Sequence, residues 1–137
     1  MSYQPGTIAR IDLSNGTVEK EAITEDLRSK YIGGRGINIR LLFDEAPPGL
    51  DPLAFEAPLI FGAGLFSGTA APCGARFNVT AKSPLTGIVG DANGGGHFGP
   101  ALKRAGIDHL VIRTDEPFVH KLRYFLGTRG LLGRGTR

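Results

Sequence analysis

The stretch Arg76–Gly96 constrains the fold more than any other part of this 137-residue sequence. Its first half alternates between apolar and polar residues, which places Phe77, Val79 and Ala81 on one face of a half-buried strand. A turn is predicted at Ser83–Gly87, because its proline fixes φ and its glycine permits a left-handed conformation. The chain is therefore expected to form a tight, hairpin-like unit here.

The second half of this stretch exposes main chain. Ile88–Gly90 is expected to return to the core, and Asp91–Gly96, which ends in three consecutive glycines, follows it. Consecutive glycines build no core and cost conformational entropy, but they let a large, flat or anionic ligand approach main-chain N–H and C=O groups. With Arg76 as a nearby fixed cation, the pattern predicts an anionic cofactor site.

Composition limits the class of protein. Hydrophobic residues make up 41% and charged residues 21% of the chain, which are ordinary values for one globular domain. No apolar run approaches the ~20 residues that a membrane helix needs, and the N-terminus lacks the pattern of a secretory signal. The single cysteine, Cys73, excludes an internal disulfide. These features predict a cytoplasmic protein without a membrane partner.

The positive net charge belongs to the C-terminal tail. Residues 1–119 carry 11 basic and 13 acidic side chains, a net charge of −2, whereas residues 120–137 carry 5 basic side chains and no acid. A slightly acidic domain argues against nucleic acid as a partner. From about residue 119 the chain has no periodicity and repeats Gly, Arg and Leu. We hypothesise that it is the aberrant end of a frameshifted gene; a solvated basic tail with a real partner is the alternative.

The remaining segments carry ordinary signals for strands and short helices. Strands are predicted at 7–13, 17–23, 59–61 and 107–113, and helices at 24–31, 37–43 and 97–105. The first two strands are expected to form a hairpin, because Asn15 and Gly16 tolerate positive φ. Gly33–Gly36 is interpreted as a turn between two helices with a solvated Arg35, in preference to an anion cradle.

Several long motifs resemble those of one enzyme family. The segments RFNVTAKSPLTG at 76–87 and DANGGGHFGPALKRAG at 91–106 are similar, in order and spacing, to the N-terminal domain of tungsten-dependent aldehyde:ferredoxin oxidoreductases. The resemblance extends to IDLSNGT at 11–17, YIGGRG at 31–36 and GLFSGTAAP at 64–72, and it covers about residues 6–113. Motifs of this length are far more specific than a lone glycine motif.

The resemblance implies an α+β fold: a mainly antiparallel two-sheet, cofactor-binding domain with a few short helices, incomplete relative to the family. Residues 1–118 are expected to form this partial pterin-binding domain, and residues 119–137 the atypical basic tail. In the family the domain carries an internal two-fold repeat, of which this chain spans the first half and little of the second. A poorly covered sheet edge and self-association into homo-oligomers are expected as a result.

The implied chemistry is a redox reaction at a metal. The family holds tungsten, or molybdenum, between two pterins near one [4Fe-4S] cluster, oxidises aldehydes to carboxylic acids and passes electrons to ferredoxin. A sibling branch acting on sugar-phosphate aldehydes or aryl-CoA thioesters is a close variant. The cluster cysteines, the second pterin-binding segments and the substrate cavity are missing from this chain, so it is predicted to be inactive alone. A stand-alone pterin- or phosphate-binding or assembly module is the alternative.

Three residues match cofactor-binding positions of the family. Arg76 matches the arginine that contacts the pterin, and Asn93 and Gly95 match positions where main-chain groups meet the pterin and its bridging magnesium. No catalytic residue is assigned, and no side chain is assigned to a metal. Cys73 matches no cluster ligand, since a [4Fe-4S] cluster takes four cysteines, and it is interpreted as a small packed residue. His97 adjoins the glycines and is a further candidate for a contact with cofactor or substrate.

Overall fold

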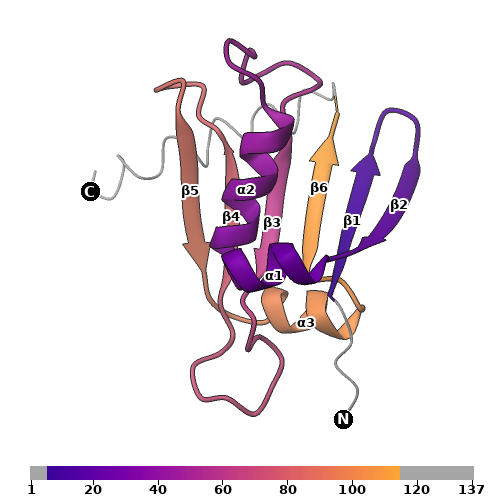
Figure 1. The fold of residues 1–137 in the computed structure, drawn as a ribbon, viewed down its shortest axis with the longest axis vertical. Coiled ribbons are helices and arrows are strands. Elements are labelled where there is room, and N and C mark those ends of the chain that lie inside the picture. The colour runs from indigo at the N-terminus through magenta and orange to yellow at the C-terminus, as the bar shows by residue number, and fades with distance from the viewer. Residues whose placement is uncertain (1–5, 115–137) are drawn as a thin grey trace, which may run out of the picture.

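Six strands and three helices make up residues 6–114, the part of the chain described by this computed structural model (Figure 1). The strands are β1 (Thr7–Asp12), β2 (Thr17–Ala22), β3 (Leu59–Ala63), β4 (Phe77–Lys82), β5 (Val89–Gly94) and β6 (His109–Arg113). The helices are α1 (Glu25–Tyr31), α2 (Arg35–Glu45) and α3 (Phe98–Arg104). All strands lie in one mixed sheet, in the order β2-β1-β6-β3-β4-β5. The predicted α+β class is confirmed.

The expected pair of antiparallel sheets is wrong for the described residues, because β6 joins all the strands into one sheet. β6 lies between β1 and β3, parallel to β1 and antiparallel to β3. Without it, the β1–β2 hairpin and the β3–β4–β5 meander would form two separate antiparallel units. Sequence patterns identify β1 to β4 and β6, and only the start of β5, but they carry no signal for this long-range pairing, which sets Ile8 opposite His109.

The strands β2 and β5 form the two edges of the sheet within residues 6–114. An edge strand presents unpaired main-chain groups, so the expected self-association stays a prediction with a physical basis. The expected domain boundary at residue 118 and the atypical basic tail lie outside the described residues. Within them, no helix is long and apolar enough to cross a membrane.

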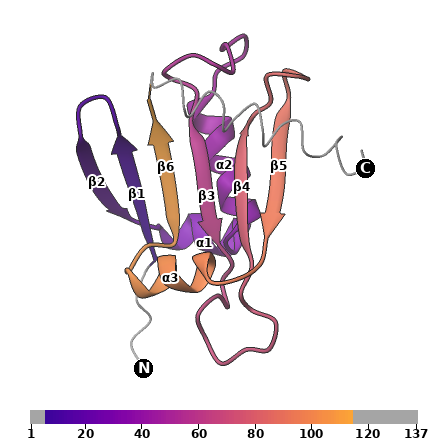
Figure 2. The same ribbon diagram turned by 180° about the vertical axis from the view of Figure 1, so that it is seen from behind.

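Helices α1 and α2 cover one face of the sheet, and α3 crosses one end of the opposite face (Figure 1, Figure 2). The main core contains the buried residues Ile8, Ile23, Ile37, Leu41, Leu42, Ile60 and Val111. A smaller apolar cluster contains Leu59 and Val79, with Phe61, Phe77, Ala81 and Ile112 packed against them. Strand alternation places the first cluster under the two helices and the second on the opposite face.

Local signals account for the ends of α1 and α2. Thr24 caps α1, since its hydroxyl oxygen accepts a hydrogen bond from a first-turn main-chain N–H at 3.2 Å. The predicted turn between the helices is confirmed: Gly34 has a φ of +51°, and a Cβ at Gly36 would overlap the carbonyl oxygen of Tyr31. Packing of the two helices therefore explains these glycines without a ligand.

The prediction of a half-buried β4 is wrong for the polar face of the strand. Asn78 and Thr80 are 2% and 1% exposed beneath α2, while Val79 is buried on the opposite face. The expected return of the next strand to the core is also wrong, because Ile88 and Val89 are 68% and 48% exposed. Val89 begins β5, the edge strand of the sheet, and Ile88 directly precedes it, so neither residue has a further strand beside it.

A chain of hydrogen bonds explains how the polar face of β4 can be buried. Asn38 Oδ1 lies 2.7 Å from His109 Nδ1, and both residues are 0% exposed. Asn38 Nδ2 donates to Asn78 Oδ1 at 3.0 Å, and Thr80 Oγ1 donates to the same oxygen at 2.7 Å. Asn78 Nδ2 then donates to a carboxylate oxygen of Asp91. Because buried polar groups are costly when unpaired, this chain fixes α2 against β6, β4 and β5.

Burial keeps His109 neutral at physiological pH. Desolvation lowers the pKa of its imidazole from 6.5 to about 4. Asn38 Oδ1 can only accept, so the proton of the neutral ring lies on Nδ1. Nε2 is buried with no hydrogen-bond partner among the described residues. The donors of His109, Asn38 and Asn78 therefore all point along the hydrogen-bond chain, from His109 towards Asp91.

Replacing Gly62 tests the packing of this chain. A Cβ there would lie 2.7 Å from His109 Nδ1 and closer still to Asn38 Oδ1. Because neither group can move without losing its hydrogen bond, we expect Gly62→Ala to lower the free energy of unfolding by about 2–3 kcal/mol in urea denaturation. The control is Gly90→Ala, whose Cβ makes an ordinary 3.4 Å contact, with an expected change within about 0.5 kcal/mol. Equal losses in both variants would contradict the packing explanation.

The neutral His109 also predicts a pH dependence of stability. Below pH 6.5 the unfolded chain takes up a proton that the folded chain refuses until about pH 4. The free energy of unfolding should therefore fall by up to about 3 kcal/mol across this range. Its slope should flatten in His109→Gln, which keeps a donor to Asn38. Denaturation series at several pH values, run on both proteins, measure this; identical slopes would contradict a buried neutral imidazole.

Candidate functional site

The register of β4 and β5 brings the three residues predicted to bind cofactor to one end of the sheet. Phe77 and Gly94 form the last pair of this antiparallel ladder, and Asn78 is paired with Asn93. Arg76 directly precedes β4 and Gly95 directly follows β5, so both adjoin the end of the ladder at the Phe77–Gly94 pair. The structure therefore brings Arg76, Asn93 and Gly95 to the same end of the sheet, and their role in binding a cofactor stays a prediction.

The main chain of Arg76 is held firmly while its side chain is exposed. Its carbonyl oxygen accepts hydrogen bonds from Gly64 N at 3.1 Å and from Ser67 Oγ at 2.8 Å. Ser67 is 1% exposed, although it belongs to the loop 64–76 between β3 and β4. Arg76 itself is exposed. Its guanidinium therefore projects from a fixed point, as a cation that recognises a ligand requires.

The start of α3 packs against the same point. The ring of Phe98 lies 4.8 Å from that of Phe77 and 5.7 Å from that of Phe61, between centroids. A Cβ at Gly99 would lie 3.2 Å from the Arg76 carbonyl oxygen, so the helix can approach this closely only with glycine there. The short segment 95–97 therefore spans two anchored elements beside Arg76.

Different structural features account for two of the three consecutive glycines. A Cβ at Gly94 would lie 2.6 Å from the Phe77 ring, and Gly96 has a φ of +95°, which favours glycine. Gly95 has neither feature: no atom lies within 4 Å of a Cβ built there, and its φ is not in the left-handed region. Among the glycines of residues 6–114, Gly95 is the one that combines a φ outside the left-handed region with no atom within 4 Å of a built Cβ. Its main chain is open to a ligand.

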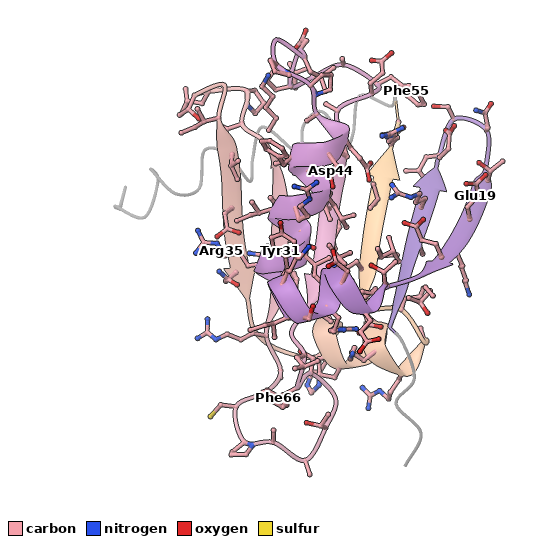
Figure 3. All side chains as sticks on the ribbon, in the orientation of Figure 1. Glu19, Tyr31, Arg35, Asp44, Phe55 and Phe66 are labelled. Carbon is pink, nitrogen blue, oxygen red and sulfur yellow. The ribbon has the colours of Figure 1, made fainter. Side chains whose placement is uncertain are left out.

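An ion pair that the sequence patterns missed lies on the same edge. Arg35, the first residue of α2, has its Nε 3.1 Å from Asp91 Oδ2 in β5 (Figure 3). Asn93 follows on the same face of β5, because side chains two apart in a strand share a face. Asp91 was expected in exposed main chain and Arg35 in solvent. Had the strand expected to begin at Ile88 been extended to Gly94, strand alternation would have placed the side chains of Asp91 and Asn93 on the same face.

Two other residues considered in the sequence analysis, Cys73 and His97, lie at the surface near this end of the sheet. Cys73 is exposed and has a φ of +59°, so its interpretation as a packed residue is wrong. His97 is exposed beside the glycines, and its contact with a ligand stays a prediction. In the described residues, no group of three or more His, Cys, Asp or Glu side chains is arranged to hold a metal ion.

The groups at this edge have the chemistry needed to bind a flat, anionic ligand, which is the kind of ligand that the sequence predicts. It offers open main chain at Gly95, the carbonyl and amide of Asn93, and the fork of donors of Arg76. Arginine is always charged and forms paired hydrogen bonds with phosphate and carboxylate groups. These groups bind and orient a ligand; they include no nucleophile or general base.

The chain is similar to known proteins in sequence and in fold. Residues 8–119 match the family described as "Aldehyde ferredoxin oxidoreductase, N-terminal domain". Over 114 residues the chain is 48% identical to the tungsten-containing aldehyde ferredoxin oxidoreductase of Pyrococcus furiosus and 47% identical to that of Thermococcus kodakarensis. Each alignment covers 82% of this chain and 19% of the relative. The chain is also 31% identical, over 112 residues, to the aliphatic sulfonate oxidoreductase, WOR-like subunit, of Pyrococcus furiosus, covering 79% of this chain and 18% of that protein.

A solved structure shares the fold. The active-site complex BamBC of benzoyl coenzyme A reductase, in complex with 1,5-dienoyl-CoA, superposes with a TM-score of 0.77 and 37% identity. The match covers 79% of this chain and 16% of that one. The chain thus spans about a fifth of the length of the relatives it matches. It belongs to the aldehyde ferredoxin oxidoreductase family, and the part of that family it contains is the N-terminal domain.

Proposed function

We propose that this chain is the N-terminal, cofactor-binding part of a tungsten-bis-pterin oxidoreductase. Such an enzyme oxidises aldehydes to carboxylic acids and passes electrons through a [4Fe-4S] cluster to ferredoxin in the cytoplasm. In the proposed site, Arg76 binds the pterin, and the main chain at Asn93 and Gly95 contacts the pterin and its bridging magnesium. The metal and pterins, when bound, supply the oxygen-transfer and redox chemistry. This chain's residues bind and orient them.

The observation that carries the proposal is the unexplained glycine at position 95. Packing explains Gly94, and backbone conformation explains Gly96, but Gly95 has neither explanation. A glycine in an otherwise unconstrained position is accounted for by a ligand that must reach the main chain. Arg76 supports the same interpretation, because its backbone is fixed by Gly64 and Ser67 while its side chain is exposed.

The relatives support a role in cofactor binding rather than in substrate choice. Their names refer to different substrates: an aldehyde, an aliphatic sulfonate and, for the solved structure, a CoA thioester. A domain common to all of them is expected to serve what they share. The substrate pocket and the cluster ligands are accordingly assigned to the four fifths of the relatives that this chain does not cover.

A stand-alone binding module is the second candidate function. It is favoured by the grouping of Arg76, Asn93 and Gly95 within residues 6–114, on a sheet with its own core. Both candidates require the site to bind a pterin. They differ in whether the chain takes part in catalysis as a portion of a longer enzyme.

Substitution of Gly95 tests the proposed site. A methyl group there meets no protein atom, so we expect Gly95→Ala to leave the free energy of unfolding within about 0.5 kcal/mol of the parent. It should weaken binding of a 6-alkylpterin phosphomonoester at least about tenfold, because the side chain occupies the space of the ligand. Titration of the pterin's own fluorescence measures this affinity. Gly90→Ala on the same strand is the control, and equal affinities of both variants would refute the assignment of Gly95.

Removing the charge of Arg76 should weaken the binding of the same ligand. We expect Arg76→Gln to weaken pterin binding by about ten- to hundredfold, since it deletes a charge-assisted hydrogen-bond donor. Arg104→Gln, an exposed arginine at the end of α3, provides the matched control. Unaltered affinity in Arg76→Gln would show that the arginine is not part of the site.

The purified 137-residue chain is expected to show no aldehyde-dependent reduction of a viologen dye. The physical reason is that one cysteine cannot hold a [4Fe-4S] cluster, so electrons have no route to an acceptor. The protein should be produced in a host without any homologue and supplied with tungstate. Turnover under these conditions would overturn the prediction that the chain is inactive alone.

A further inference from the structure

Arg35 is the described arginine that forms an ion pair with the strand of the candidate site. It is the first residue of α2, its side chain is 63% exposed, and its Nε lies 3.1 Å from Asp91 Oδ2 in β5. Figure 3 shows it beside β5 at the edge of the sheet. Because the contact is made through Nε and most of the side chain is exposed, the outer part of the guanidinium is accessible to a ligand.

The position of this guanidinium is fixed by the buried hydrogen-bond chain. The second oxygen of Asp91 accepts from Asn78, and Asn78 accepts in turn from Asn38. Asn38 is one turn along α2 from Arg35, so helix and strand are joined at two points. Both oxygens of Asp91 are thus engaged, which limits its repulsion of an approaching anion. The Arg35 side chain is thus oriented by its ion pair, whereas for Arg76 it is the main chain that is held.

Arg35 and Arg76 flank the exposed main chain of the site. Asp91, the partner of Arg35, precedes Gly95 by four residues, or about 13 Å of extended chain, and Arg76 adjoins the same end of the β4–β5 ladder as Gly95. The predicted magnesium-contacting residue, Asn93, lies between them. A ligand with a flat ring at one end and a phosphate at the other fits two cations separated along one strand.

The other ion-paired arginines on the helix-covered side differ from Arg35 in their partners. Arg10 and Arg113 both pair with Glu45, far from β5 along the sheet, and Arg28 pairs with Asp108. Arg40 pairs with a residue of its own helix, one turn further on. None of these pairs contacts β5.

We propose that Arg35 is a second arginine of the cofactor site and binds the phosphate group of the pterin cofactor, while Arg76 and Gly95 contact the ring end. This inference rests on the proposed function and adds a residue to it. Arginine suits the role, because its planar fork of donors matches the oxygens of a phosphomonoester. Its ion pair with Asp91 uses Nε, which leaves the outer nitrogens of the guanidinium for the phosphate.

Two probes separate the phosphate contact from the ring contact. Fluorescence titrations of the 137-residue chain use a 6-alkylpterin phosphomonoester and the same pterin without its phosphate. The parent chain should bind the phosphorylated probe more tightly. In Arg35→Gln, affinity for the phosphorylated probe should fall about tenfold, to the level of the other probe, whose own affinity should not change. Arg35→Lys keeps the charge but loses the fork, so its loss should be intermediate.

Arg40→Gln is the matched control, since it removes the same charge from a half-buried position of the same helix, where the arginine pairs with Asp44. It should change neither affinity, and both variants should have the same melting temperature. Equal loss for the two probes in Arg35→Gln would show a structural role and overturn the inference, as would no loss for either. If the parent chain binds neither probe, the proposed function itself fails and this inference fails with it.

Discussion

The hydrogen-bond chain from His109 to Asp91 is the interaction on which the arrangement of the site depends. It crosses the sheet beneath α2 and reaches β6, β4 and β5 through Asn38 and Asn78. An apolar interface would tolerate sliding of a strand, whereas the amides of Asn38 and Asn78 are satisfied by acceptors at fixed positions on β3, β4 and β5. The hydrogen-bond chain therefore sets the register of β5, and with it the position of the exposed main chain at Gly95.

A second set of close contacts holds the other half of the site. The Arg76 carbonyl oxygen is held by Gly64 and Ser67, and Gly99 brings α3 against it. Loop 64–76 and α3 thus converge on one backbone atom, while the arginine side chain remains exposed. This division between a fixed main chain and an accessible side chain is what a cofactor-orienting residue needs, because orientation is lost if its support can move.

Much of the local structure was predictable, and the tertiary pairing was not. The hairpin of β1 and β2 follows from alternation and turn chemistry, and Thr24 marks the start of α1. The family motifs indicated Arg76, Asn93 and Gly95, which the structure brings together. The single sheet could not be predicted, because β6 pairs with β1 about 100 residues away without a local signal. The burial of Asn78 and the pairing of Arg35 depend on the same long-range contacts.

The most direct test of this account maps where a pterin binds. Amide chemical shifts of the nitrogen-15-labelled chain would be recorded with increasing amounts of a 6-alkylpterin phosphomonoester. The account predicts shifts at Arg76 and across residues 93–96, with none along β2 at the opposite edge of the sheet. Shifts confined to β1 and β2, or no shifts at saturating ligand, would contradict the claim that the β4–β5 end of the sheet is the cofactor site.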